Sequence, residues 1–588
     1  MRDGVRLGRV LAGSALVLLV GLGLTPPTAG SAARSPAAGS AARAAALQGD
    51  GSAAQAAGAQ GDGSAAQAAG PQGDGSAARA AGPQGAGPQG DGSAAQPAGG
   101  HTAGVAAAGC PVGDLPKRQL RGTWIASVSN INWPSRTGLT VAAQQAELRS
   151  LLDQAKALRL NAVFLQIRPA ADAFWPSPYE PWSQYLTGTQ GGSPGYDPLA
   201  FAVAEAHARN LELHGWFNPY RVSTQPDVTK LSAGHPARTN PTWIERYDGK
   251  LFYNPGVPAA RQHTVNAIMD AVGRYDLDGV HFDDYFYPYP VSGQVFDDAA
   301  EYAAYGAGRS LADWRRANVD TLVQEVAARI RQVKPHVRFG ISPFGIWRNA
   351  STDPLGSATS GLQSYDAIYA DSRSWVKQGW VDYLAPQLYW TIGFTAAPYE
   401  VLVPWWSDVV AGTDVQLYVG QATYRITTWG DPEEMPGHLV LNRDHRVSGD
   451  IHYSIKELLA NPLGFADRLR TDFYRNPALV PVNARLGGTA PYAPTGLTAR
   501  RTATGVELSW TAAPGGTAAT YFAVYRADGA GCGIEAGRNL IAVPRAAGTG
   551  TQRFTDPAPP PVGEVTYLVT AVSRLHHEST PVSVTAPN

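Results

Sequence analysis

Eight short apolar runs, separated by amphipathic stretches, follow one another between residues 121 and 455. In residues 141–160 and 310–334 the apolar positions between the runs recur at the spacing of an α-helix. Buried strands alternating with helices predict an α/β fold with a parallel sheet, and eight such units predict a (β/α)8 TIM-type barrel. An open doubly wound sheet is the alternative, but no glycine-rich phosphate turn follows the first run. The eight runs are RGTWIASV, NAVFLQIRP, LELHGWFNPY, DGVHFDDYFYP, VRFGISPFG, VDYLAPQLYW, VQLYVGQATY and SGDIHYSI.

A different pattern begins near Ala493, with short runs bounded by Gly, Pro and Thr and no helical stretch. In GVELSW the alternation places Val506, Leu508 and Trp510 on one side, which is typical of a half-buried strand. Residues 493–588 therefore predict a small all-β sandwich that follows the barrel.

The first 109 residues predict two segments that lack a packed core. Three arginines precede the apolar run VLAGSALVLLVGLGL, which is short for a bilayer span, so residues 1–31 predict a removable signal peptide. From Gly49 to about Gly99 the unit QGDGSAAQAAGP recurs without aromatic or large aliphatic residues, and residues 32–109 predict a flexible linker. We expect a secreted or envelope-associated protein with no stable membrane span after signal removal.

The composition argues against nucleic acid as a binding partner. The 47 basic and 48 acidic residues give a formal net charge of -1, and no run of Lys or Arg exceeds two residues, so electrostatic binding to nucleic acid is not expected. The 25 Tyr and 15 Trp residues suit sugar stacking, although large apolar cores also use aromatic residues. The only two cysteines, Cys110 and Cys532, either pair in an exported protein or remain free thiols.

Candidate chemistry gathers where the predicted strands end, which is the catalytic edge of a (β/α)8 barrel. Amide side chains there would bind sugar hydroxyls or backbone groups, and aromatic ones would stack on sugars or pack. The two arginines would bind an acidic substituent or neutralise nearby aspartates. The expected substrate-binding residues are Arg168, Asn218, Tyr220, Arg221, Tyr285, Trp347, Gln387, Tyr389 and Trp390.

Asp283 and Asp284 are adjacent carboxylates at the end of a hydrophobic run, where burial is unfavourable unless they are paired, hydrogen-bonded or reactive. Glycoside hydrolysis usually needs two carboxyl groups. Neighbouring side chains of a regular strand point to opposite faces, so Asp283 is the expected reacting group if it shares the inward face with His281, and Asp284 if the parity is reversed. Asp371 is the expected second carboxylate, or else a helix N-cap.

A metal site is a weaker interpretation of the same region. His214, His281 and Asp283 lie on neighbouring predicted strands, and such a set is conceivable as a ligand cluster. Both histidines lie deeper in their strands than the strand-end residues, which favours hydrogen bonds inside the barrel. We therefore expect no metal and no cofactor, and no serine nucleophile elbow of the G-x-S-x-G kind directly follows a predicted strand, which argues against an esterase.

Seven blocks, in order from about Lys117 to Tyr474, resemble the glycosyl hydrolase-like 10 family. They are RGTWIASVSNINWPS, NAVFLQIRPAADAFWPSPYEPWSQYLTG, LELHGWFNPYRVS, DGVHFDDYFYP, ISPFGIWRN, YADSRSWV and YLAPQLYW. The resemblance implies a barrel domain over residues 110–485 that cleaves a bacterial cell-wall glycan, peptidoglycan strands or a related polysaccharide. The C-terminal region resembles a fibronectin type III module, with Trp510 and Tyr567 at the family's aromatic positions. The alternative function is a non-catalytic glycan-binding or adhesion protein.

Overall fold

The predicted barrel is present in the computed structural model, which describes residues 115–527, 533–548, 550–560 and 563–586. Its parallel strands follow the order β10-β9-β8-β7-β3-β2-β1-β12-β11. Each strand falls within or next to one of the apolar runs of the sequence. The strands are β1 (Leu120–Ile125), β2 (Ala162–Arg168), β3 (Glu212–Phe217), β7 (Gly279–Phe282), β8 (Arg338–Ile341), β9 (Tyr383–Leu384), β10 (Gln416–Leu417), β11 (Val419–Gln421) and β12 (Gly449–His452).

The sheet closes through its seventh chain segment. Strand β10 pairs with β9, and β11 pairs with β12. Only Tyr418 separates β10 from β11, so one continuous segment joins the two ends of the strand order. The prediction of a (β/α)8 barrel is confirmed, and the alternative of an open sheet is wrong.

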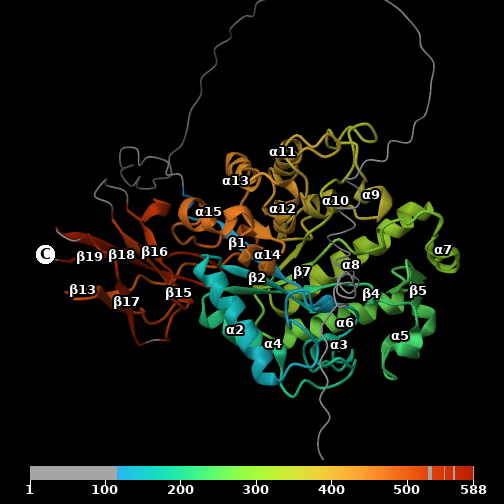
Figure 1. Cartoon of the computed structure of the whole chain (residues 1–588), viewed down its shortest axis with the longest axis horizontal. Helices are drawn as coiled ribbons and strands as arrows, with labels where there is room; N and C mark the ends of the chain where they lie inside the picture. The colour runs from blue at the N-terminus through green and yellow to red at the C-terminus, as the bar shows by residue number, and fades with distance from the viewer. Residues whose placement is uncertain (1–114, 528–532, 549, 561–562, 587–588) are drawn as a thin grey trace, which may run out of the picture. The chain divides into compact units, whose positions relative to one another are not determined.

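Helices surround the strands, as Figure 1 shows for α2, α4, α6 and α8. The two stretches with helical spacing form α2 and α8, whose N-caps are Thr140 and Ser310. The longer helices of the barrel are α2 (Val141–Ala157), α4 (Pro198–Ala208), α6 (Pro258–Arg274), α7 (Ala299–Tyr305), α8 (Leu311–Val333), α10 (Ser372–Lys377), α11 (Tyr399–Val410), α13 (Glu434–Asp444) and α14 (Ile455–Leu459).

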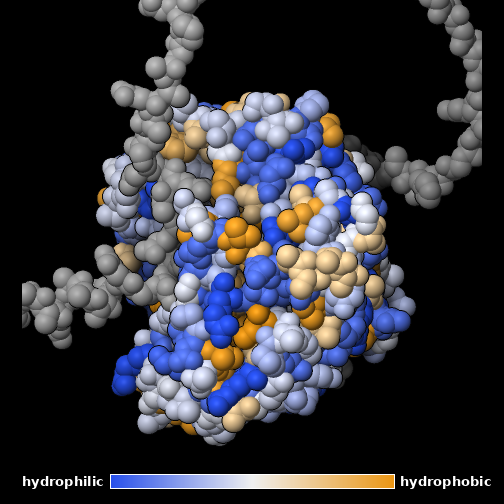
Figure 2. Space-filling view, turned by 90° about the vertical axis from the view of Figure 1, so that its right-hand side faces the viewer, coloured by the Kyte–Doolittle hydropathy of each residue, from blue (hydrophilic) through white to orange (hydrophobic). Residues whose placement is uncertain are grey.

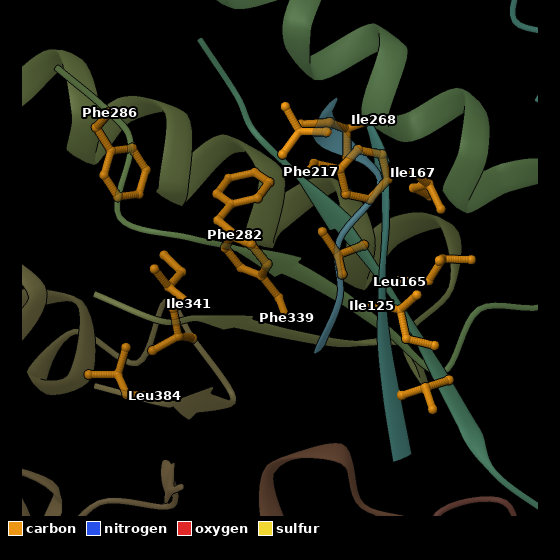
Figure 3. Packing of buried hydrophobic residues seen from close by; sticks show 14 of the residues in the cluster. Ile125, Leu165, Ile167, Phe217, Ile268, Phe282, Phe286, Phe339, Ile341 and Leu384 are labelled. Carbon is orange, nitrogen blue, oxygen red and sulfur yellow. The ribbon is translucent and has the colours of Figure 1, made fainter. Parts of the chain in front are cut away.

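The main core lies between the strands and these helices. Figure 3 shows Phe282 of β7 beside Phe339 of β8, and their ring centroids are 5.1 Å apart. Phe282 therefore points outward from the barrel, and the preceding residue, His281, points inward. This alternation fixes the direction of the residues that lead into the candidate site.

The connection between β3 and β7 carries a small antiparallel sheet of its own, in the order β4-β6-β5. Its strands are β4 (Arg221–Ser223), β5 (Ile244–Tyr247) and β6 (Lys250–Tyr253). Arg221, the first residue of β4, follows the end of β3 by only four positions, so this insertion begins at the edge formed by the carboxyl ends of the barrel strands.

The C-terminal segment forms two antiparallel sheets, in the orders β13-β14-β17 and β16-β15-β18-β19. Both sheets contribute to one core, in which Trp510 of β14 packs against Phe522 of β15 with ring centroids 5.4 Å apart. A small all-β sandwich is thus present. Its strands are β13 (Thr495–Thr502), β14 (Gly505–Thr511), β15 (Tyr521–Arg526), β16 (Leu540–Ala542), β17 (Thr551–Asp556), β18 (Val565–Val572) and β19 (Val582–Ala586).

The predicted signal peptide, the linker and both cysteines lie outside the described residues. Within the described part of the chain, no helix has the length and apolar character needed to cross a membrane. On the face shown in Figure 2, hydrophilic residues interrupt the hydrophobic ones, as is normal for a surface in contact with water.

Candidate active site

Asp283 and Asp284 lie side by side at the catalytic edge of the barrel, directly after β7. Both are buried, with 3% and 1% of their surface exposed. Strict alternation ends with the strand at Phe282, so both carboxylates reach the same small pocket, and the expectation that only one of them faces it is wrong. The pocket is lined by Trp124, Trp216, Asp283, Asp284, Ser342, Gln387, Tyr389 and Tyr453.

Asp283 accepts hydrogen bonds from groups that can only donate. Trp216 Nε1 donates to Oδ2 at 3.1 Å, and Asn218 Nδ2 donates to the same oxygen. The backbone N–H of Tyr285 faces Oδ1 at 3.4 Å. Because indole, amide and backbone N–H groups have no lone pair to offer at nitrogen, this environment favours the ionised carboxylate.

Asp284 has a different set of partners. Gln387 Nε2 donates to Oδ1 at 3.0 Å, and the hydroxyl of Tyr289 contacts Oδ2. A phenol hydroxyl both donates and accepts hydrogen bonds, so the Tyr289 oxygen can accept a hydrogen bond from the O–H group of a protonated Asp284. This carboxyl group can therefore remain protonated without leaving two donors face to face.

A chain of donors orients Asn218 toward Asp283. Two backbone N–H groups of the loop after β1 donate to Gln166 Oε1, each at 2.9 Å. Gln166 Nε2 then donates to Asn218 Oδ1 at 2.6 Å, and Arg221 Nη2 donates to the same oxygen at 3.0 Å. With its oxygen occupied on both sides, Asn218 presents its NH₂ group to Asp283.

Burial is the main cause of the acid–base properties of the pair. Burial first, and the neighbouring Asp284 carboxylate second, raise the pKa of Asp283 to about 7, although the Arg221 guanidinium acts in the opposite direction. Burial also raises the pKa of Asp284. Two like charges in one buried pocket do not ionise together near neutral pH, so the pair holds one proton. The hydrogen-bond partners place that proton on Asp284.

Arg168, expected to contact substrate or the aspartates, is instead fully buried in an ion pair. Its Nε donates to Glu180 Oε2 at 2.8 Å, and its Nη2 faces Oε1. Its Nη1 donates to the carbonyls of Asn218 and Pro219, the latter at 3.1 Å. Arg168 thus fixes the loop that carries Asn218, and it presents no exposed surface to a ligand.

Asp371 is the N-cap of α10, which is one of the two roles expected for it, the other being the second catalytic carboxylate. Its Oδ1 accepts the backbone N–H of Ser374 at 3.2 Å and Trp347 Nε1 at 2.8 Å. Trp347 lies nearly parallel to Trp405, with centroids 6.2 Å apart. Neither Asp371 nor Trp347 lines the pocket of the aspartate pair.

The other expected residues divide into two groups. Gln387 and Tyr389 line the pocket, and Tyr285 lies beside it beneath the Arg221 guanidinium, 5.7 Å from ring centroid to charge centre. Tyr220 is fully buried in the main core, and Trp390 packs edge-on against Phe344 with centroids 5.5 Å apart. These last two positions serve packing.

Sequence reasoning missed several residues of the pocket. Trp124, Trp216 and Tyr453 stand near the ends of β1, β3 and β12, and Ser342 directly follows β8. The rule that strand ends carry the site would have found them if it had been applied to every strand. Tyr289, five positions beyond Asp284, had no such signal.

His214 and His281 form an interior hydrogen-bond network. Both Nδ1 atoms contact the hydroxyl of Tyr383, at 3.0 and 3.1 Å. His281 Nε2 accepts a hydrogen bond from Trp124 Nε1 at 3.1 Å. Burial lowers the pKa of both histidines. Among the described residues, no group of three His, Cys, Asp or Glu side chains is arranged to hold a metal ion.

A closed parallel barrel with paired carboxylates at the carboxyl ends of its strands defines the class of barrel hydrolases. The model of the glycosyl hydrolase-like 10 family matches residues 119–434, and the chain belongs to this family. It is a glycoside hydrolase, an enzyme that acts on glycans.

Two curated relatives each match more than half of the chain. The glycosyl hydrolase YngK of Bacillus subtilis is 48% identical over 475 residues, which is 79% of this chain and 92% of the relative. The glycosyl hydrolase DigH of Escherichia coli K12 is 41% identical over 340 residues, 55% of this chain and 76% of the relative. Among solved structures, the glycoside hydrolase domain of PgaB (BpsB) from Bordetella bronchiseptica aligns with a TM-score of 0.43 at 15% identity, covering 61% of this chain and 99% of that domain.

Proposed function

We propose that the protein is an exported glycoside hydrolase that cleaves glycosidic bonds in the glycan strands of bacterial peptidoglycan. The observation that carries the catalytic part is the pair of buried carboxylates, Asp283 and Asp284, in one pocket with different hydrogen-bond partners. The substrate and the export are supported by the resemblance of the strand-end blocks and by the charged and apolar pattern of the first residues.

The two carboxyl groups have separate roles in this proposal. Asp284, which keeps the shared proton, donates it to the oxygen of the leaving sugar. Asp283, ionised among N–H donors, stabilises the positive charge that develops at the anomeric carbon. Tyr389, Tyr453 and Trp216 form the aromatic walls against which a sugar ring packs.

Digestion of purified glycan strands tests the proposal. Strands freed of stem peptides, intact peptidoglycan and an unrelated plant polysaccharide are incubated with the protein, and the products are identified by mass spectrometry. We expect saccharide fragments from the bacterial strands alone. Binding without any released fragment would instead support the non-catalytic, glycan-binding alternative.

Variants connect turnover to the pocket. Asp283→Asn and Asp284→Asn are each expected to lower turnover by on the order of a hundredfold or more, the usual contribution of an acid or base group. Asp248→Asn is the matched control, because Asp248 lies in an exposed turn with φ of 52°, a conformation that Asn also adopts. Near-normal turnover in both pocket variants would show that the catalytic groups lie elsewhere in the protein.

A further inference from the structure

The two carboxylates of the pocket come from consecutive residues at the end of one strand. Among the described residues that line the pocket, no other side chain carries a carboxyl group. In most glycoside hydrolases the acid and the nucleophile or base flank the scissile bond from two sides. Here both groups come from one strand, and no carboxyl group from another strand is among the described residues that line the pocket.

Hydrogen bonding also makes Asp283 a poor nucleophile. Its Oδ2 accepts from both Trp216 Nε1 and Asn218 Nδ2, which occupies the two lone pairs of that oxygen. Its Oδ1 has a single partner, the backbone N–H of Tyr285 at 3.4 Å. Oδ1 therefore keeps a lone pair for one further donor. A fixed, ionised acceptor of this kind is suited to hold an N–H group of a ligand.

The rest of the pocket suits a small substituent with an amide and a methyl group. Four aromatic side chains, Trp124, Trp216, Tyr389 and Tyr453, line it beside the two carboxyl groups. Aromatic faces pack well against a methyl group and keep water away from a reacting centre. An acetamido group would place its methyl against these rings and its N–H toward Asp283.

We propose that the nucleophile is the 2-acetamido group of the substrate itself, so that the enzyme requires an N-acetylated amino sugar on the glycosyl side of the bond it cleaves. This inference rests on the proposed glycan-strand activity and names its substrate class. The sugars of peptidoglycan strands carry this group, and hydrolases that use it are a recognised exception to the two-carboxylate mechanisms.

The reaction balances with the groups present. The acetamido oxygen forms a bond to the anomeric carbon while the bond from that carbon to the leaving oxygen breaks. The leaving oxygen takes the proton of Asp284, and Asp283 holds the acetamido N–H as positive charge develops on the amide. Water then attacks the anomeric carbon of the cyclic intermediate and gives a proton to Asp284. The ring opens, and the product keeps the configuration of the substrate.

Strands with a changed amide test the role of this group. Glycan strands are chemically de-N-acetylated, and samples are then re-acylated with acetyl, fluoroacetyl or difluoroacetyl groups. Re-acetylated strands, the matched control for backbone damage, should be cleaved like native ones. Free-amine strands should be cleaved on the order of a thousandfold more slowly, because they lack an intramolecular nucleophile, and each fluorine should lower turnover further. Equal cleavage of all samples would refute the inference.

Stereochemistry and inhibition provide an independent readout. Proton NMR of the first product should show retained anomeric configuration, and a thiazoline analogue of N-acetylglucosamine, which mimics the cyclic intermediate, should inhibit competitively. An inverted first product overturns the inference. So does an Asp283→Gly variant that azide rescues to form a glycosyl azide of inverted configuration, because that outcome makes Asp283 the nucleophile.

The two proposals fail in different ways. If native strands are not cleaved, the proposed function fails, and the inference about the acetamido group fails with it. If native and free-amine strands are cleaved at rates within a few-fold of each other, only the inference fails. The full-length protein is used throughout, with Asp248→Asn as the control for expression and folding.

Discussion

Replacing Asp283 by Asn should change the pH dependence of folding stability in a defined direction. Burial and the Asp284 carboxylate raise the pKa of Asp283 to about 7, from an ordinary value of 3.8. Because the two groups titrate together, this value describes the loss of the one proton that the pair shares. A carboxyl group with a raised pKa stabilises the folded state fully below pH 4, and this stability is lost as the pH rises from about 4 to about 7. In the variant no neighbouring carboxylate opposes the ionisation of Asp284, so this loss of stability should be smaller.

The size of the effect follows from the same two values. A difference of about three pH units corresponds to about 4 kcal/mol of unfolding free energy at pH 8. Relative to wild type, Asp283→Asn should therefore become more stable by up to about 4 kcal/mol between pH 4 and pH 8. Part of this gain depends on Asp284, since removing the neighbouring charge lets Asp284 ionise more easily.

Denaturant unfolding at pH 4, 5, 6, 7 and 8, followed by tryptophan fluorescence, measures this difference for wild type, Asp283→Asn and Asp248→Asn. The control variant should track wild type at every pH, since its side chain is exposed. A stability difference between wild type and Asp283→Asn that does not change with pH would show that the pair loses no proton between pH 4 and pH 8. The assignment of one shared proton to the pair would then be wrong.

Three further predictions concern residues outside the carboxylate pair. Gln166→Leu removes the donor that orients Asn218, so it should lower kcat about tenfold with little change in KM and displace the acidic limb of the pH–rate profile. An unchanged pH–rate profile would show that Gln166 has a packing role only. Glu180→Gln leaves Arg168 buried without its charge partner, and denaturant unfolding should show a loss of about 3–5 kcal/mol, whereas a loss under 1 kcal/mol contradicts the ion-pair role. Trp510→Ala should destabilise the C-terminal sandwich by about 3–5 kcal/mol in a thermal melt, because a fully buried indole is removed from its core. Glycan cleavage should persist, because no described residue of the sandwich lines the pocket of the aspartate pair, and loss of cleavage would contradict this expectation.

The barrel was predictable because its strands are buried on both faces, except at Gln416 of β10, which is partly exposed. Such strands read as continuous apolar runs, and the eight runs locate all the barrel strands. The break at Tyr418, which divides the seventh run into β10 and β11, had no sequence signal, because it depends on pairing with β9 on one side and β12 on the other. Local patterns do not contain such long-range pairing.

The site residues were predictable only where the place of a residue along its own strand determines where its side chain lies. The aspartate pair directly follows β7, and Gln387 lies three positions after the end of β9, so the strand-end rule locates them. Arg168 also ends a strand, but its role depends on Glu180, a residue from the following loop whose position the rule does not describe. Asp371 was ambiguous because a carboxylate before a short helix satisfies capping and catalysis equally well as a pattern.

Two adjacent buried carboxylates would strongly destabilise a barrel if both were charged, and the surrounding residues explain why they are tolerated. Donors around Asp283 compensate one charge, while the hydroxyl of Tyr289 allows Asp284 to stay neutral. The same arrangement makes the two groups chemically different, since Asp283 is a fixed, ionised hydrogen-bond acceptor and Asp284 is an acid. The features that let the fold accept the pair therefore also assign its roles, and removing any donor to Asp283 should weaken stability above neutral pH and turnover together.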